Sequence, residues 1–202
     1  MAGQKEIYTP VLDEYLADFE LVRSDLEGKM ILDAGAGRRM FAKEGLELGI
    51  GGIVSLGDSR NWWLDVLGMM ETLRRVRPES EDLRRWETVG RNSVEGFLFE
   101  LPFAANSFDL ILCRDTLIPR IFIEPTRMTE AYRELVRVLM PGGRAIVLPV
   151  WFDNWDNDEK WCAGEALAAL VEMRGIRLEV RESVRMVAGM EAVGLTADLY
   201  KS

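Results

Sequence analysis

Two spacings of apolar residues alternate along the chain. Short stretches rich in apolar residues predict strands at 30–33, 53–56, 94–100, 108–113 and 144–150. The continuous apolar run at 108–113 is typical of a strand that is buried on both faces of a parallel sheet. Apolar residues three or four positions apart predict amphipathic helices, at 10–26, 38–48, 61–76, 126–140 and 158–174. Two closing strands are expected at 176–187 and 195–200. Strands alternating with helices predict an α/β domain of three layers with right-handed βαβ crossovers.

We expect a single domain that spans residues 1–202, because the sequence contains no repeat, low-complexity tract or linker. Residues 1–27 are expected to form an N-terminal helical segment that lies across the sheet edge or over a pocket. Residues 74–92 form an arginine-rich insertion in which acidic residues are interleaved. This pattern predicts a solvated helix laced with ion pairs, and the alternative is an anion-binding or partner-binding face.

Charge and composition narrow the classes of function. With 25 basic and 34 acidic residues the formal net charge is −9, which argues against binding to nucleic acid or to an anionic membrane. The two cysteines, Cys113 and Cys162, have no metal-binding spacing and indicate a reduced, cytoplasmic setting. No stretch is long enough to cross a membrane. Because the sequence has no histidine, histidine triads, histidine bases and histidine-ligated metals are excluded.

A glycine turn follows the first predicted strand, in the order Asp33, Ala34, Gly35, Ala36, Gly37. Such a turn lets a ligand approach the backbone and aims the N–H groups of the next helix at it. A lone Gly-x-Gly turn is equally compatible with a simple chain reversal. Asp58 follows the second strand, where an acidic residue either accepts hydrogen bonds from a ribose diol or caps the next helix.

Three stretches together resemble the class I S-adenosylmethionine-dependent methyltransferases, especially the group that acts on small molecules. They are Ile-Leu-Asp-Ala-Gly-Ala-Gly at 31–37, Leu-Pro-Phe-Ala-Ala-Asn-Ser-Phe-Asp-Leu-Ile at 101–111, and Tyr-Arg-Glu-Leu-Val-Arg-Val-Leu-Met-Pro-Gly-Gly-Arg at 132–144. The resemblance implies a Rossmann-like three-layer sandwich whose seven-stranded sheet is mostly parallel, with the last strand antiparallel. It also implies S-adenosylmethionine as the cofactor and a small molecule as the methyl acceptor.

The resemblance assigns cofactor contacts by position. The glycine turn would hold the amino-acid end of the cofactor, through Asp33, Gly35, Ala36 and Gly37. The ribose would lie at Asp58, and the adenine between residues that follow the third strand, Phe97 and Leu98. The end of the fourth strand, with Cys113 and Arg114, would lie near the methionine moiety.

Several departures from the family pattern leave other functions open. Arg38 and Arg39 stand where the family has another glycine, and an aromatic replaces the acid that contacts the adenine, within 96–99. One alternative is a non-catalytic methyltransferase-like module that binds a protein partner. Another is a site for a different anionic nucleotide, paired with Arg38 or Arg39.

No catalytic residue is identified from the sequence. Tyr15, Asp115 and Asp153 occupy positions that face the mouth of the expected pocket or cap neighbouring elements. The aromatic residues that open the last quarter of the chain either close over an apolar substrate or pack beneath the final helix; they are Trp151, Phe152 and Trp155.

Overall fold

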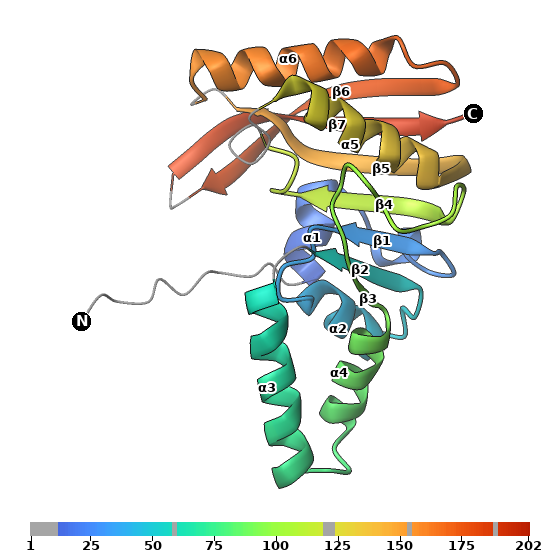
Figure 1. Ribbon diagram of the computed structural model, residues 1–202, viewed down its shortest axis with the longest axis vertical. Coiled ribbons are helices and arrows are strands. Elements are labelled where there is room, and N and C mark those ends of the chain that lie inside the picture. The colour runs from blue at the N-terminus through green and yellow to red at the C-terminus, as the bar shows by residue number, and fades with distance from the viewer. Residues whose placement is uncertain (1–11, 58–59, 119–123, 153–154, 188–189) are drawn as a thin grey trace.

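One sheet of seven strands runs through the molecule in the order β3-β2-β1-β4-β5-β7-β6 (Figure 1). The computed structural model describes residues 12–57, 60–118, 124–152, 155–187 and 190–202. The strands are β1 Ile31–Ala34, β2 Ile53–Gly57, β3 Ser93–Glu95, β4 Phe108–Arg114, β5 Leu139–Phe152, β6 Ile176–Val187 and β7 Met190–Lys201. The first five run parallel, whereas β7 is antiparallel to both β5 and β6. The predicted fold class is therefore confirmed, including its antiparallel last strand.

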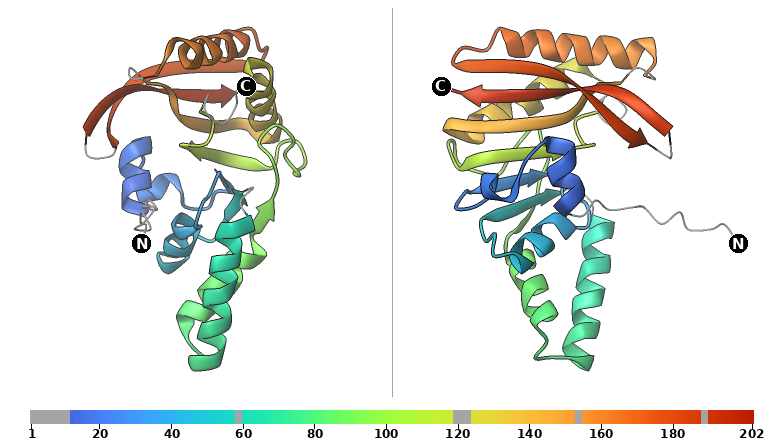
Figure 2. Two further views of the ribbon diagram at one scale, coloured as in Figure 1. Left: turned by 60° about the vertical axis from the view of Figure 1, so that its left-hand side comes forward. Right: turned by 180° about the vertical axis from the view of Figure 1, so that it is seen from behind.

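Helices cover both faces of this sheet and complete the three layers (Figure 2). Side chains of α1 Leu12–Phe19, α2 Met40–Glu47, α3 Arg60–Val76 and α4 Glu81–Arg91 belong to the core cluster on one face. On the other face lies the cluster that contains α5 Pro125–Val138 and α6 Asn157–Val171. A short 3-10 helix, η1 Arg23–Asp25, precedes β1. Ile31 of β1 belongs to the first cluster and Leu32 and Ala34 to the second, as expected of a strand buried on both faces.

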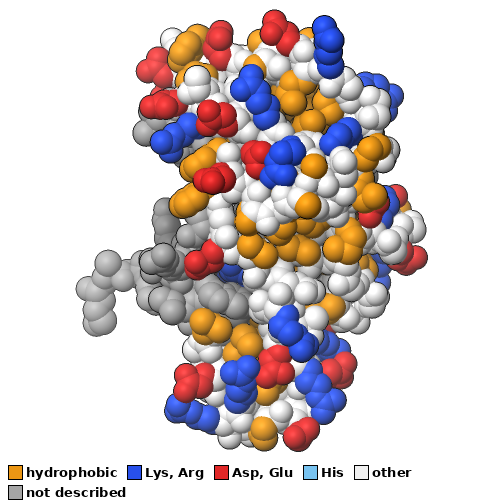
Figure 3. All heavy atoms as spheres, turned by 45° about the vertical axis from the view of Figure 1, so that its right-hand side comes forward, with side chains coloured by type: hydrophobic (Ala, Val, Ile, Leu, Met, Phe, Trp, Pro, Cys, Tyr) orange, Lys and Arg blue, Asp and Glu red, His pale blue; other side chains and the backbone are white. Residues whose placement is uncertain are grey.

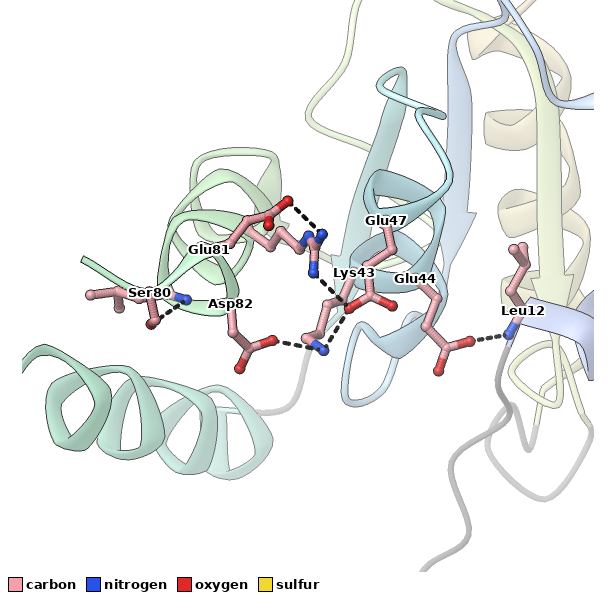
Figure 4. Close-up of polar contacts among 9 residues, drawn as sticks. Leu12, Lys43, Glu44, Glu47, Ser80, Glu81 and Asp82 are labelled. Atoms are coloured by element: carbon pink, nitrogen blue, oxygen red, sulfur yellow. Dashed lines mark hydrogen bonds and ion pairs between the residues drawn. The ribbon is translucent and has the colours of Figure 1, made fainter. Parts of the chain in front are cut away.

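The helices α3 and α4 form a hairpin that extends beyond the β3 edge of the sheet (Figure 1). Leu83, Trp86 and Val89 give α4 a buried stripe in the core. Ion pairs cover its other faces, and Figure 4 shows those that join α4 to α2. The Lys43 ammonium lies 3.0 Å from the carboxylates of both Asp82 and Glu47. The arginine-rich segment 74–92 thus comprises the end of α3 and the whole of α4, and ion pairs cover its surface as its charge pattern predicts.

The chain between β3 and β4 differs from the expected strand at 94–100. The strand ends at Glu95, and no helix forms before β4 begins at Phe108. Two side chains of α5 form hydrogen bonds with the backbone of this connection. The backbone N–H of Leu101 donates to Glu134 at 2.8 Å, and Arg137 donates to the carbonyls of Leu101 at 2.9 Å and Phe103 at 2.8 Å. These contacts fix the backbone at 101–103, so the connection to β4 is a loop held against α5.

Three other boundaries also differ from those expected from the sequence: the end of α1 and the starts of β5 and β7. Glu20 has φ +53, a left-handed conformation that ends α1 well before residue 26. Leu139 pairs with Phe108, so β5 begins earlier than residue 144. The pairing of Val187 with Met190 makes β6 and β7 a long hairpin, so β7 begins before residue 195.

Candidate functional site at the carboxyl edge of the sheet

The carboxyl ends of β1, β2 and β4 meet at one edge, on the left of Figure 1. Ala34 is in register with Leu56 of β2 and with Cys113 of β4. The glycine turn begins at the next residue and is fastened to β2, because the N–H groups of Gly35 and Ala36 both donate to the Leu56 carbonyl, at 2.9 and 2.8 Å. The turn that the sequence predicts is therefore rigidly placed at the edge where parallel α/β sheets bind ligands.

The two glycines of the turn meet different surroundings. Gly35 has φ +87, and a Cβ built on it would overlap the side chain of Thr116, which follows β4. Gly37 has φ +47, is exposed, and has no atom within 4 Å of the position of such a Cβ. Gly35 is thus required for packing, whereas Gly37 leaves an open stretch of backbone that a ligand can approach.

Asp33 lies directly beneath the turn and is fully buried. The Tyr15 hydroxyl of α1 donates to its Oδ1 at 3.2 Å. The Oδ2 atom is buried and has no hydrogen-bond partner among the described residues. Burial raises the pKa of this carboxyl to about 7, although the Tyr15 hydrogen bond and the charges of Arg39 and Arg114 favour its ionised form. A carboxylate oxygen that is buried without a donor marks a place for a cation or a donor from a ligand.

Arg39 closes the turn on its other side. Its backbone is left-handed, with φ +62, and its side chain is only 2% exposed. Nε donates to Ser93 Oγ at 3.1 Å and Nη1 to the Gly37 carbonyl at 2.9 Å. Nη2 lies against the end of β2, 3.4 Å from where a Cβ on Gly57 would stand. Burial lowers the pKa of the guanidinium, and the charges of Asp33 and Glu95 oppose that shift.

Arg114, at the end of β4, fastens α1 over the site. Its Nε donates to Asp18 at 2.6 Å, and its guanidinium lies 5.5 Å from the centre of the Tyr15 ring. That ring also stacks on Phe41 of α2, with centroids 4.6 Å apart. Burial, followed by the charge of Asp33, raises the pKa of Tyr15 well above its usual value, so its hydroxyl stays protonated and donates.

Of the other residues that were predicted to contact the cofactor, some are outside the described residues, some are buried in the core, and Phe97 is exposed. Asp58 and Asp153 are outside the described residues. Ala36 is buried, and the side chains of Leu98 and Cys113 are buried in the core cluster beneath α5. Burial raises the pKa of the Cys113 thiol to about 12. Phe97 is 54% exposed and stacks on Phe99, with centroids 5.2 Å apart.

The aromatic residues near the start of α6 contribute to packing. Trp155 is 6% exposed and packs with Ala163, Ile118 and Trp151. The Phe152 side chain is outside the described atoms. Thr116 and Ser93 help to build the site but escaped sequence reasoning, since neither belongs to a motif and both act through contacts distant in the chain.

Comparison with known protein families identifies the chain. A family model described as "Methyltransferase domain" matches residues 46–147, about half of the sequence. The chain belongs to the methyltransferase domain family. The match includes both the stretch 101–111 and the stretch 132–144, whose contacts join the loop before β4 to α5. The glycine turn lies before the matched residues.

Solved structures of methyltransferases share this fold. NodS, an N-methyltransferase from Bradyrhizobium japonicum in complex with S-adenosyl-L-homocysteine, is 16% identical, with a TM-score of 0.55 over 94% of this chain and 86% of that one. A methyltransferase from Methanosarcina mazei is 18% identical, with a TM-score of 0.56 over 87% and 93% of the two chains. The glycopeptide N-methyltransferase MtfA is 13% identical, with a TM-score of 0.62 over 97% and 92%. At these identities the similarity establishes the fold alone.

A sequence search of the curated proteins finds no match. Among the helices that the structure describes, none is both long and apolar enough to cross a bilayer.

Proposed function

We propose that this methyltransferase domain binds S-adenosylmethionine at the glycine turn and transfers its methyl group to a small molecule. The buried Asp33 Oδ2 carries the proposal, because it needs a partner that the described residues do not provide. The amino-acid end of S-adenosylmethionine carries an ammonium group, which is a suitable donor. Gly37 directly follows Ala36, is exposed, and has no described atom within 4 Å of the position of a Cβ, so the adjoining backbone is accessible.

The remaining contacts follow from the resemblance. Asp58 would receive the ribose, and the adenine would lie beside Phe97 and Leu98. The exposed ring of Phe97 offers a stacking face at the end of β3, whereas the Leu98 side chain is turned into the core and would contribute backbone only. Cys113 likewise would contribute backbone, and Arg114 would flank the methionine moiety from its position beside Asp18.

When bound, S-adenosylmethionine supplies a methyl group on a positively charged sulfur. The chemistry it would supply is an in-line methyl transfer, with Asp33 and the glycine turn holding its amino-acid end. The task of the protein is then to fix the direction of approach and to exclude water. Tyr15, Phe41 and Arg114 form a packed wall of α1, α2 and β4 that serves this purpose.

A small-molecule acceptor fits the charge distribution better than a polyanion. The chain carries a net charge of −9. On the face shown in Figure 3, acidic and basic side chains of the described residues are interspersed, and hydrophobic side chains gather across the middle. A long phosphate backbone would meet repulsion as often as attraction there. We also propose a cytoplasmic location and one folded domain, in which the 74–92 segment is an addition to the family fold.

A second candidate function is a non-catalytic methyltransferase-like module that binds a protein partner. The observation that favours it is Arg39, which fills space beside the end of β2 and the start of β3 from the position of the family's third glycine. The two candidates differ in whether the cofactor binds at all.

Calorimetric titration with S-adenosylmethionine and S-adenosylhomocysteine separates the two candidates. We expect binding in the micromolar range, and we expect Gly37→Ala to weaken it at least tenfold. That substitution adds a methyl group where the described residues leave space, so its cost to folding is only the left-handed backbone, about 1–2 kcal/mol. Absence of binding by either ligand at millimolar concentration would overturn the proposed function.

A further inference from the structure

The strand β6 forms one end of the sheet, and among the described residues only β7 pairs with it (Figure 1). It is 12 residues long, and its register with β7 is unbroken along that length. A long edge strand presents a row of backbone N–H and C=O groups to other chains, and proteins usually blunt such edges with prolines or bulges. The strand β6 contains neither. Its outer edge is therefore a place where a further strand can pair.

The first half of β6 has an apolar face and a charged face, because successive side chains point to opposite sides of a strand. On the apolar face, Ile176 and Leu178 are half-buried against the core cluster that contains α6, and Val180 is 45% exposed. On the charged face, the side chains of Arg177 and Glu179 are 66% and 51% exposed and lie 3.2 Å apart. Both charged groups are accessible to a neighbouring chain.

The sequence at 174–182 is complementary to itself when two copies run antiparallel. It reads Arg-Gly-Ile-Arg-Leu-Glu-Val-Arg-Glu. Residues directly opposite each other in an antiparallel pair share a face of the sheet and interact. When the pair is centred on Leu178, every apolar residue meets an apolar residue and every opposed pair of charges is of opposite sign. The opposed residues are Arg174 with Glu182, Ile176 with Val180, Arg177 with Glu179, and Leu178 with its own copy.

Charge also disfavours the two adjacent registers. Centring the pair on residue 177 would place the two Arg177 side chains opposite each other. Centring it on residue 179 would oppose the two Glu179 side chains in the same way. Like charges directly opposite destabilise a strand pair. The segment therefore favours one register by attraction and excludes its neighbours by repulsion.

We propose that the outer edge of β6 is a homodimer interface, at which two copies of this chain pair antiparallel about Leu178 and form one continuous sheet. A second copy is the partner that fits, because a two-fold interface requires a surface that complements itself. Existing ion pairs are kept in this arrangement. Arg181 is opposed by Gly175, which has no side chain, and it stays bound to Asp198 at 3.1 Å and to Glu20 of its own chain.

Sedimentation equilibrium of the full chain tests the proposal. We expect twice the mass of one chain at about 100 μM, where a dimer with a micromolar dissociation constant is nearly complete. Arg177→Glu and Glu179→Arg should each have the mass of one chain, because each opposes like charges across the two-fold axis. Arg77→Glu makes the same change of charge at an exposed residue between α3 and α4. This matched control should stay dimeric.

Mixing the two single variants separates charge pairing from damage to the fold. Arg177→Glu carries two acidic side chains at the interface and Glu179→Arg carries two basic ones, so an equal mixture should form the dimer that neither forms alone. The double variant Arg177→Glu/Glu179→Arg should dimerise like the unaltered chain. An unaltered chain with the mass of one copy, single variants that stay dimeric, or a mixture that does not associate would each overturn the proposal.

A cross-link at the two-fold axis provides a second measurement. Opposed residues in an antiparallel pair have Cα atoms about 4.5–5.5 Å apart, a separation that a disulfide spans. Oxidation of Leu178→Cys with diamide should join two chains, whereas Glu165→Cys, exposed on α6, should remain unlinked. The native cysteines, Cys113 and Cys162, are both buried. Failure of Leu178→Cys to cross-link would count against the dimer and would leave the proposed function intact, because neither measurement involves the cofactor.

Discussion

At the scale of single residues, the burial of Asp33 in the candidate site lowers the stability of the folded protein at neutral and alkaline pH. Its pKa of about 7 is higher than the value near 3.9 of an unfolded chain. The folded state therefore holds a proton that the unfolded state has lost, and stability decreases as the pH rises from about 4 to about 7. A residue retained at this cost, fully buried, is typical of a binding or catalytic site.

Asp33→Asn should therefore stabilise the protein at alkaline pH. The amide keeps an acceptor for the Tyr15 hydroxyl but carries no charge to bury. We expect the variant to gain roughly 2–4 kcal/mol at pH 8, with the gain growing between pH 5 and pH 7 and then levelling off. Urea unfolding at several pH values measures it, and the exposed Glu165→Gln serves as the control. A variant less stable than the original chain at pH 8 would contradict the raised pKa of the Asp33 carboxyl.

The two glycines of the turn should respond differently to the same change. Gly35→Ala places a methyl group inside the Thr116 side chain as well as straining the backbone, and we expect a loss of about 2–4 kcal/mol. Gly37→Ala meets no described atom within 4 Å and should lose about 1–2 kcal/mol. Denaturant unfolding of both variants checks the difference. Equal losses would contradict the packing described around Gly35.

At the scale of elements, the stretches that carried the family resemblance serve mainly as scaffold. The Asp109 carboxylate accepts from the Met30 N–H at 2.8 Å and fixes the entry to β1. Glu134 and Arg137 of α5 bind the loop that leads into β4. These side chains hold backbone segments of the fold together, so the stretches resemble the family even though residues at the expected cofactor positions depart from its pattern.

Glu134→Gln tests this link between α5 and the loop. The hydrogen bond from Arg137 is the main reason that the pKa of Glu134 lies below its usual value. A lowered pKa means that the stabilisation is present above about pH 4.3 and is lost as the pH falls. We expect a loss of about 1–2 kcal/mol at pH 7 that vanishes in acid. Thermal unfolding measures it, with the exposed Glu130→Gln of the same helix as the control. A loss that persists unchanged in acid would contradict the charge-assisted contact.

At the scale of the whole molecule, apolar periodicity specified the order of strands and helices but not their ends. The ends depend on contacts between distant parts of the chain, such as the capture of Leu101 by Glu134 and the pairing of Leu139 with Phe108. The sequence predicted a turn that brings Asp33, Gly35 and Gly37 together, and their role in holding a cofactor stays a prediction. The roles of Ser93 and Thr116 could not be predicted, because each depends on a partner more than fifty residues away.

Ligand binding should be visible in the stability of the entire chain, because a ligand that binds only the folded state raises its free energy of unfolding. At one hundred times the dissociation constant the gain is about 2.7 kcal/mol. For a chain of this size we expect S-adenosylhomocysteine to raise the melting temperature by about 5–10 °C.

Asp33→Asn provides the decisive comparison for that shift. The variant should melt higher than the original chain without ligand at pH 8, yet gain much less from S-adenosylhomocysteine, because the amide offers the ammonium group no opposite charge. Differential scanning fluorimetry with and without the ligand measures both effects in one experiment. If the ligand raised the melting temperature of both proteins equally, Asp33 would not contact the ligand. If it raised the melting temperature of neither, the partner-binding module would be favoured over the enzyme.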